Sequence, residues 1–230
     1  CNPFWCRYEK WRGMKKERRE PPTVEQLETV KAHPEGFGLC AWLFMYTGCS
    51  LGEVLALQWG DVDFEKNRIR ISKGVAWLHN QPIVQIPKTA SGVRTVPLLS
   101  PLRAVLEPLR GADSEYILGG ERPLTGTAYQ HRWAYYCRDV GMAHCTVQTR
   151  KNKHRGKVYD TAVKVWKADV TAHQFRHEYA SMLYAAGIGE LEAQRLMGHA
   201  DITTTRRVYT HIRERQLDTA GAALEKFIND

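Results

Sequence analysis

The spacing of hydrophobic residues predicts helices over most of the chain. Six stretches have a helical pattern of apolar residues, and the second of them is apolar throughout. These stretches are residues 23–33, 39–46, 51–57, 101–109, 128–138 and 171–230. Thr23 and Gln26 have the spacing of a capping box, so the first helix should begin at Thr23.

Alternation of apolar and polar residues predicts strands in two other regions. Between residues 62 and 98 it predicts three strands, at 68–72, 82–86 and 94–98. Between residues 145 and 170, two alternating segments flank a basic turn. Together with the helices, this pattern predicts a mainly helical α+β domain with a small antiparallel β-sheet and a basic β-hairpin insertion.

Composition narrows the class of protein. Of 230 residues, 43% are hydrophobic, enough to bury a core, and the formal net charge of +8 favours a polyanionic partner such as nucleic acid. No apolar run approaches the ~20 residues of a membrane span, and no signal peptide is visible. The six cysteines form no CxxC pair, which argues against a zinc ribbon. We therefore expect a reduced, cytoplasmic protein without membrane contact.

The stretch from Thr171 to Tyr179 combines residues suited to binding an anion. Thr171 and Gln174 form a second capping box, so a helix begins here. His173 and Arg176 are three residues apart and share one face of the first turns, where free N–H groups and the helix dipole favour an anion. The planar guanidinium of Arg176 suits phosphate oxygens. Surface charge beside a structural histidine is the alternative interpretation.

Downstream, Gly198 is a candidate C-cap, and Asp201 a candidate N-cap for a short helix. Three short motifs then follow one another in fewer than forty residues: His173-x-x-Arg176, Leu196-Met-Gly-His199 and Tyr209-Thr-His211. Together they resemble the C-terminal signature of the tyrosine recombinases of the phage-integrase type. Residues 46–53 with 57–63 resemble that family's first catalytic box, and residues 87–98 resemble its β-hairpin lysine motif.

The resemblance implies a reaction and its participants. In that family a tyrosine hydroxyl attacks a DNA phosphodiester, which gives a 3′-phosphotyrosyl link and a free 5′-hydroxyl, so no metal and no other cofactor is needed. By resemblance, Tyr209 is the nucleophile and Arg176 neutralises a non-bridging oxygen. His173 and His199 would donate hydrogen bonds to the phosphate or move protons around it.

Other residues receive supporting roles. Lys88 would be the general acid that protonates the leaving 5′-oxygen, although it lies in a turn-like segment and Lys73 is a rival candidate. Glu53 occupies the family's acidic position, which helps arrange the site, unless it only caps a helix or pairs with a neighbour. His177 and His211 are expected to support the site or the structure.

One position departs from the family pattern Thr-Gly-x-Arg-x-Gly-Glu, because Ser50 stands where the first arginine belongs. Losing a preorganised charge-stabilising group commonly costs on the order of 10²–10³ in rate. Engineered inactivation, decay of a mobile element, and partial rescue by a nearby cation such as Lys73 are all compatible with Ser50. We expect this chain to bind DNA but to cleave it poorly.

The expected partners are double-stranded DNA and further copies of the chain. The proposed DNA contacts are Arg94 and the basic turn that contains Arg150, Lys151, Lys153, Arg155 and Lys157. A solvated charged hairpin is the alternative for that turn. An apolar stripe near the C-terminus predicts a helix that docks on a neighbouring protomer, in a tetrameric assembly on DNA, or else packs on its own domain. Its members are Leu217, Ala220, Leu224, Phe227 and Ile228.

The expected domain organisation follows the same resemblance. Residues 23–230 form the catalytic domain, and residues 1–22, aromatic and basic, form a linker or the end of a missing core-binding domain. The chain begins at Cys1 rather than Met, which also suggests a fragment.

Three other functions are alternatives to a site-specific recombinase. A non-catalytic DNA-binding homologue that keeps the fold is compatible with Ser50. A type IB topoisomerase shares the chemistry, but the spacing from Gly198-His199 to Tyr209 and the small domain are more similar to integrases. A metal protein is disfavoured because the histidines align with a phosphate site and lack metal-site spacing.

Overall fold

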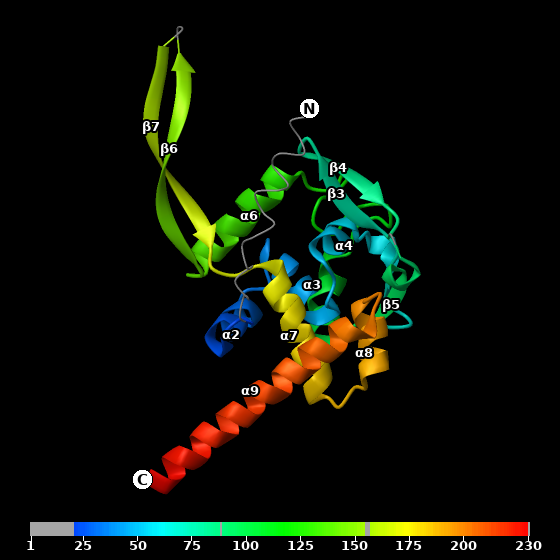
Figure 1. The fold of residues 1–230 in the computed structure, drawn as a ribbon. Coiled ribbons are helices and arrows are strands. Elements are labelled where there is room, and N and C mark those ends of the chain that lie inside the picture. The colour runs from blue at the N-terminus through cyan, green and yellow to red at the C-terminus, as the bar shows by residue number, and fades with distance from the viewer. Residues whose placement is uncertain (1–20, 88, 155–156, 230) are drawn as a thin grey trace, which may run out of the picture.

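The computed structural model describes residues 21–229, apart from 88 and 155–156. Three helices are followed by a group of strands, two helices, a long hairpin and three more helices (Figure 1). The α-helices are α2 (Val24–Ala32), α3 (Gly38–Thr47), α4 (Leu51–Ala56), α5 (Ser100–Leu106), α6 (Gly126–Asp139), α7 (Ala172–Ala185), α8 (Glu190–Met197) and α9 (Ile202–Asn229). The short 3-10 helices are η1 (Trp59–Asp61), η2 (Ala90–Gly92) and η3 (Glu107–Leu109). No helix of the described residues is long and apolar enough to cross a membrane.

Helix α3 forms the centre of the core. Nine of its ten residues are buried, and α7, α2 and α5 pack around it. The indole N–H of Trp42 donates to the carbonyl of Val30 at 2.8 Å, which fastens α2 to α3. Phe44 on α3 meets Trp133 of α6 edge to face, and Trp133 meets Phe175 of α7 in the same way. These aromatic contacts join three helices that are far apart in the sequence into one core.

The strands form three separate antiparallel sheets rather than one. In the first, β2 (Arg68–Ile71) lies between β1 (Val62–Asp63) and β5 (Arg94–Pro97), with Ile69 opposite Val96. In the second, β3 (Gly74–Leu78) pairs with β4 (Gln81–Gln85). His79 and Asn80 connect them with φ values of 48° and 67°, and two positive φ angles suit a tight two-residue turn. The alternation predicted 82–86 as a strand of one antiparallel sheet with 68–72 and 94–98, and it missed the β3 partner.

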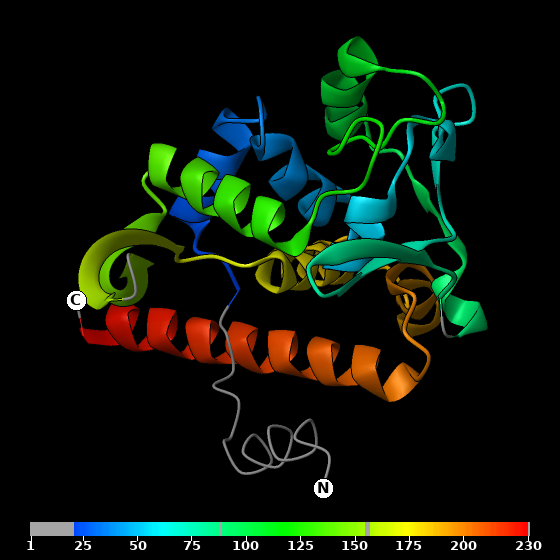
Figure 2. The same ribbon diagram turned by 90° about the horizontal axis from the view of Figure 1, so that it is seen from above.

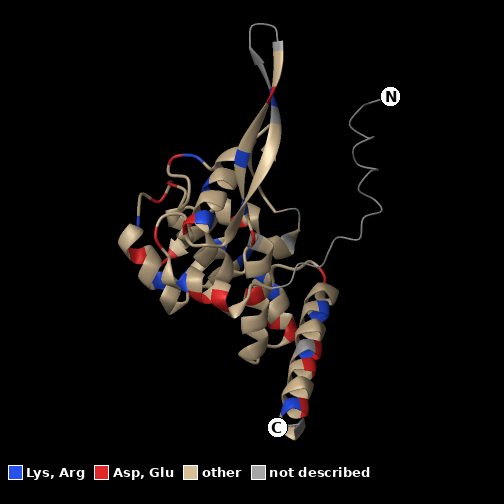
Figure 3. Cartoon of the chain, turned by 90° about the vertical axis from the view of Figure 1, so that its left-hand side faces the viewer, with Lys and Arg blue, Asp and Glu red and all other residues tan. Residues whose placement is uncertain are grey.

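A long hairpin extends from the body of the domain (Figures 1 and 3). It is formed by β6 (Ala143–His154) and β7 (Lys157–Ala168), which pair along their whole length. At its base, the indole N–H of Trp133 donates to the carbonyl of Val170 at 3.0 Å. Val147 and Val158 are 67% and 61% exposed, so the two strands are held by their mutual ladder and not by a core beneath them. The predicted hairpin insertion is confirmed as an element of the fold.

Helices α7, α8 and α9 complete the domain. Gly198 ends α8 with φ of 66°, and the carboxylate of Asp201 accepts the N–H of Thr203 at 2.9 Å at the start of α9. We predicted a short helix after Asp201, but α9 runs unbroken for 28 residues. Its first turns pack on α7 and α8, whereas its distal half leaves the body of the domain (Figure 1). Figure 2 shows α9 from above as one straight helix that continues to the C-terminus.

Candidate functional site

A sharp turn between α3 and α4 brings Ser50 to one wall of the site. Gly48 ends α3 with φ of 61°, and any side chain at this position would collide with the ring of Tyr179. The hydroxyl of Thr47 then accepts the N–H of Cys49 at 3.2 Å. The main-chain N–H of Ser50 donates to the carboxylate of Glu53 at 2.6 Å, which fixes the first turn of α4.

Glu53 and Arg94 form an ion pair beneath this turn. Two N–H groups of Arg94 meet the two oxygens of Glu53 at 2.7 and 3.1 Å, and the side chains are only 6% and 15% exposed. The remaining N–H groups of Arg94 reach the carbonyls of Leu196 at 2.8 Å and Gly92 at 3.3 Å, and the sulfur of Cys49 at 3.6 Å. All five donors therefore have protein partners.

We expected Arg94 to contact DNA, and the structure places it inside the protein instead. A guanidinium that is nearly buried and fully hydrogen-bonded has no donor left for a phosphate. Its position ties β5 to α4 and to the end of α8. In this arrangement Arg94 therefore makes a structural contribution, and we do not expect it to contact DNA directly.

Arg176 lies next to this pair. Its guanidinium donates to the carbonyl of Gly48 at 2.6 Å and to that of Met197, and it lies 3.8 Å from Glu53. One carboxylate thus faces two guanidinium groups, which leaves the cluster with a net positive charge. Burial raises the pKa of Glu53 on its own, but the hydrogen bonds and charge of Arg94 outweigh it and hold that pKa below its ordinary value. Burial lowers the pKa of Arg176.

Three histidines complete the described site. His173 and His177 face each other on α7, with their Nε2 atoms 3.0 Å apart. His199 Nδ1 is bonded to the hydroxyl of Thr205 at 2.9 Å. Burial, followed by the charges of the nearby arginines, lowers the pKa of His199 to about 4. His199 is therefore neutral near pH 7.

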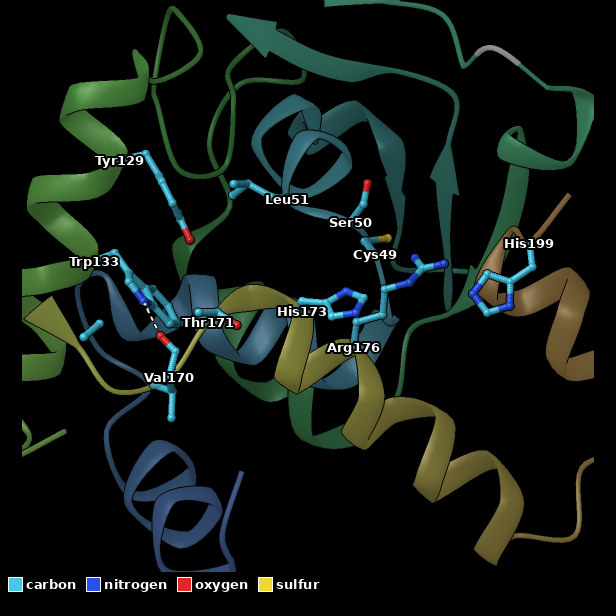
Figure 4. Close-up of a pocket in the computed structure, with 11 residues that line it drawn as sticks. Cys49, Ser50, Leu51, Tyr129, Trp133, Val170, Thr171, His173, Arg176 and His199 are labelled. Carbon is cyan, nitrogen blue, oxygen red and sulfur yellow. Dashed lines mark hydrogen bonds between the residues drawn. The ribbon is translucent and has the colours of Figure 1, made fainter. Parts of the chain in front are cut away.

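One cavity of about 700 Å³ is lined by Ser50, Arg176 and two of these histidines, His173 and His199 (Figure 4). Ser50, His173 and Arg176 lie at its centre, with His199 at one end. The opposite end is an aromatic wall formed by Tyr129 and Trp133 of α6. Sequence reasoning missed this wall, although the i, i+4 spacing of the two aromatic residues on a helix was visible. The cavity can hold an anionic group against Arg176 with apolar surface beside it.

Tyr209 does not line that cavity. Its hydroxyl donates to the carbonyl of Ile188 at 3.1 Å, its ring meets Tyr184 edge to face, and only 4% of the residue is exposed. Burial, followed by the charge of Glu190, raises the pKa of Tyr209. In this arrangement the hydroxyl is held in a separate small core formed by α7, α8 and α9.

The candidate lysines differ in what the structure describes. Lys88 and Arg155 lie outside the described residues. Lys73 is described: its ammonium lies 3.1 Å from the carboxylate of Asp61 and also donates to Gln58. Lys151 is exposed on β6, and the backbones of Arg150, Lys153 and Lys157 lie on the same hairpin.

Comparison with known proteins identifies the family. A model of the phage integrase family matches residues 31–216. The chain belongs to the phage integrase family. A XerC-like tyrosine recombinase of Caldanaerobacter subterraneus subsp. tengcongensis is 28% identical over 216 residues, which cover 87% of this chain and 52% of the relative. The ICEBs1 integrase of Bacillus subtilis is 26% identical over 175 residues, which cover 72% of this chain and 42% of the relative. This integrase-family chain thus spans about half the length of the curated relatives it matches.

Solved structures confirm the predicted fold. The Tn1549 transposon integrase in complex with transposon right end DNA superposes with a TM-score of 0.62 at 22% identity, over 94% of this chain and 68% of that one. The XerA recombinase gives a TM-score of 0.56 at 16% identity and covers 90% of this chain and 65% of that one. The integrase-like α+β fold expected from the sequence is therefore confirmed.

Proposed function

We propose that this chain is the catalytic domain of a site-specific DNA recombinase that integrates or excises a mobile element or prophage. The observation that carries the proposal is that one cavity is lined by Arg176, His173, His199 and Ser50. The family motifs assign these four sequence positions to residues that contact the reacting phosphate. The net charge of +8 and the protruding hairpin support double-stranded DNA as the substrate.

The proposed reaction exchanges one phosphoester bond for another. The oxygen of Tyr209 attacks phosphorus, the bond from phosphorus to the 5′-oxygen breaks, and the 5′-oxygen takes a proton from Lys88. Arg176 neutralises a non-bridging oxygen, while His173 and His199 donate hydrogen bonds to the phosphate or relay the tyrosine proton. Reversal of these steps on a second duplex rejoins the strands.

Two features of the site bear on how fast the isolated chain can cleave DNA. The Tyr209 hydroxyl must leave the Ile188 carbonyl before it can reach a phosphate bound at Arg176, so α9 or its surroundings must move. Ser50 supplies no charge, so Arg176 is left as the guanidinium that faces the cavity. We propose that both features keep cleavage slow in the isolated chain.

The assembly completes the proposal. The basic hairpin, with Lys151 and its neighbours, contacts the DNA backbone and sets register. The apolar side chains of distal α9 are 62–81% exposed at Leu217, Leu224, Phe227 and Ile228. We propose that they dock on a neighbouring protomer in a tetramer on DNA, in the cytoplasm at the nucleoid of a bacterium. Residues 1–22 would link this domain to a core-binding domain, and Arg94 positions Glu53 and the end of α8.

The test uses nicked suicide duplexes that carry candidate element ends, with covalent adducts resolved on denaturing gels. Adduct formation by Ser50→Arg should exceed that of the unaltered chain by on the order of 10²–10³. Ser50→Gln, which adds length without charge, should stay near the unaltered chain. Adding Tyr209→Phe to Ser50→Arg should remove the adduct. Efficient cleavage by the unaltered chain would overturn the expected impairment.

A second candidate function is favoured by Ser50 alone. In that alternative the chain occupies recombination sites without cutting them. Binding of the same duplexes by every variant, with no adduct from Ser50→Arg, would support this non-catalytic function and count against the enzyme.

A further inference from the structure

The cavity beside Arg176 has two chemically different ends. The polar end is lined by Ser50, His173, Arg176 and His199, all of which belong to the family motifs. The apolar end is lined by Leu51, Tyr129, Trp133, Ala168 and Val170. The motifs include neither Tyr129 nor Trp133. With about 700 Å³, within the roughly 300–1,000 Å³ of pockets for drug-sized ligands, the cavity has room for a phosphate and a less polar group attached to it.

The hydroxyl of Tyr129 has no hydrogen-bond partner within the described part of the chain. The ring of Tyr129 stacks on those of Trp77 and Trp133. Both indole N–H groups donate to backbone carbonyls, each at 3.0 Å. A buried tyrosine hydroxyl usually finds a partner as well. No buried side-chain oxygen or nitrogen of the described residues lacks a partner, so the free hydroxyl of Tyr129 is open to the cavity.

Figure 4 shows this hydroxyl turned from α6 toward the cavity. Burial raises the pKa of Tyr129, so the hydroxyl stays protonated near pH 7. A protonated phenol is a hydrogen-bond donor and a weak nucleophile. Tyr129 is therefore suited to contact with a ligand and not to a second attack on phosphorus.

The position of α9 indicates which side of a bound phosphate faces the aromatic wall. Thr205 of α9 is bonded to His199, so α9 reaches the cavity at the His199 end, and the wall lies at the opposite end (Figure 4). In phosphoryl transfer the attacking and leaving oxygens lie roughly in line, on opposite sides of phosphorus. An attack by Tyr209, which α9 carries, comes from the His199 end. The leaving 5′-oxygen and its nucleoside then extend toward the wall.

We propose that Tyr129 and Trp133 bind the nucleoside whose 5′-oxygen leaves during cleavage. Its deoxyribose packs against the two rings, and the Tyr129 hydroxyl donates a hydrogen bond to an oxygen of that nucleoside. This assignment rests on the proposed function and adds a contact on the leaving side to the polar residues that hold the phosphate. The shared chemistry is a deoxynucleoside joined through its 5′-oxygen to a phosphate, whether in a DNA strand or in a free nucleotide.

Isothermal titration with two probes tests this binding surface without catalysis. Inorganic phosphate and thymidine 5′-monophosphate share the phosphate, and only the second carries a nucleoside. The unaltered chain should bind the nucleotide about 10-fold or more tightly than phosphate, through one hydrogen bond and burial of part of the sugar. Tyr129→Phe removes the hydroxyl alone and should weaken nucleotide binding by about 2–10-fold, with phosphate binding unchanged.

Tyr135→Phe is the matched control, because Tyr135 lies on the same helix, is 51% exposed and does not line the cavity. It should leave both affinities unchanged. The urea midpoint of Tyr129→Phe should equal that of the unaltered chain, and a lower midpoint would count against a hydroxyl that is free in the fold. Equal affinity of the unaltered chain for the two probes would overturn the proposal, as would no binding of either probe. Undiminished nucleotide binding by Tyr129→Phe would do the same.

The role in cleavage is tested separately, with the Ser50→Arg chain on suicide duplexes. Adding Tyr129→Phe should slow adduct formation by about 2–10-fold without changing duplex binding, whereas adding Tyr135→Phe should not. An unchanged rate, together with weakened nucleotide binding, would confine the surface to free nucleotides and overturn its role on DNA. If Ser50→Arg forms no adduct, the proposed function fails, while the titration still decides whether the wall binds a nucleoside.

Discussion

The ion pair between Arg94 and Glu53 provides a stability test that needs no DNA. Replacing Arg94 with Met keeps the length of the side chain but leaves Glu53, 15% exposed, without its bidentate partner. Removing one member of a buried pair costs about 3–5 kcal/mol. Arg176, at 3.8 Å, still compensates part of the charge of Glu53 and moves the expected cost to the lower end of this range.

A second loss adds to the first. The Nε of Arg94 satisfies the carbonyl of Leu196 in the last turn of α8, and a buried acceptor left unpaired costs about 1–3 kcal/mol. Because Leu196 is only half-buried, water can replace part of this bond. We therefore expect Arg94→Met to lower the free energy of unfolding by about 3–4 kcal/mol, a large share of the roughly 5–15 kcal/mol typical of a domain.

Urea denaturation followed by circular dichroism measures this loss. The matched control is Arg206→Met, which breaks an exposed arginine–glutamate pair of similar length, 2.9 Å to Glu190, and should cost less than about 1 kcal/mol. Adding Glu53→Gln to Arg94→Met should recover part of the loss, because it removes the uncompensated buried charge. An Arg94→Met variant no less stable than Arg206→Met would refute the reasoning.

The pair also makes stability depend on pH. The folded pKa of Glu53 lies below its ordinary value of 4.5, so the stabilisation is present above that value and is lost as pH falls through the folded pKa. Arg94→Met should weaken this dependence, which urea midpoints measured between pH 6 and the acid limit of folding would record.

Three further predictions follow from the same structure. Tyr209→Phe should cost about 1 kcal/mol in unfolding experiments, since the carbonyl of Ile188 loses its donor; an unchanged midpoint would contradict the bond. His199, with a folded pKa of about 4 against 6.5, stabilises the fold fully above pH 6.5 and loses this contribution as pH falls toward 4. His199→Gln should therefore flatten stability across that window, and an unchanged slope would argue against a buried neutral histidine. Leu224→Glu should leave monomer stability within about 0.5 kcal/mol but reduce self-association on DNA in sedimentation experiments, whereas unchanged assembly would exclude distal α9 as the contact.

The sequence predicted those parts of the fold that depend on local pattern. Helices α2 to α6 follow the predicted stretches within a few residues, because each has a continuous apolar face or a capping residue such as Thr23. The same holds for the hairpin, where alternation extends over both strands. Strand partnership is a tertiary property, and so the pairing of β3 with β4 was missed.

For the site, too, local sequence motifs could be predicted, whereas contacts between distant segments could not. The motifs located His173, Arg176 and Ser50, and the structure brings them to one cavity. The motifs could not show that Arg94 turns inward, because its nearest carboxylate is 41 residues away in sequence. Nor could they show the position of Tyr209, which depends on how a 28-residue helix packs against α7 and α8. No proline follows Asp201 in the sequence, and the single glycine of α9, Gly221, does not end the helix, so the predicted short helix continues.

The unbroken path of α9 has a consequence for its local stability. From residue 213 to 228 every side chain that the structure describes is exposed, so this half of the helix is held by its own backbone hydrogen bonds. Isolated helices shorter than about 12–15 residues are marginal in water, and Gly221 weakens this one by about 1 kcal/mol relative to Ala. Amide protons near Tyr209 should therefore exchange slowly and those beyond residue 213 quickly. A protomer that covers the distal end would slow their exchange, and the entropy lost in that ordering would set a limit on how tightly subunits associate.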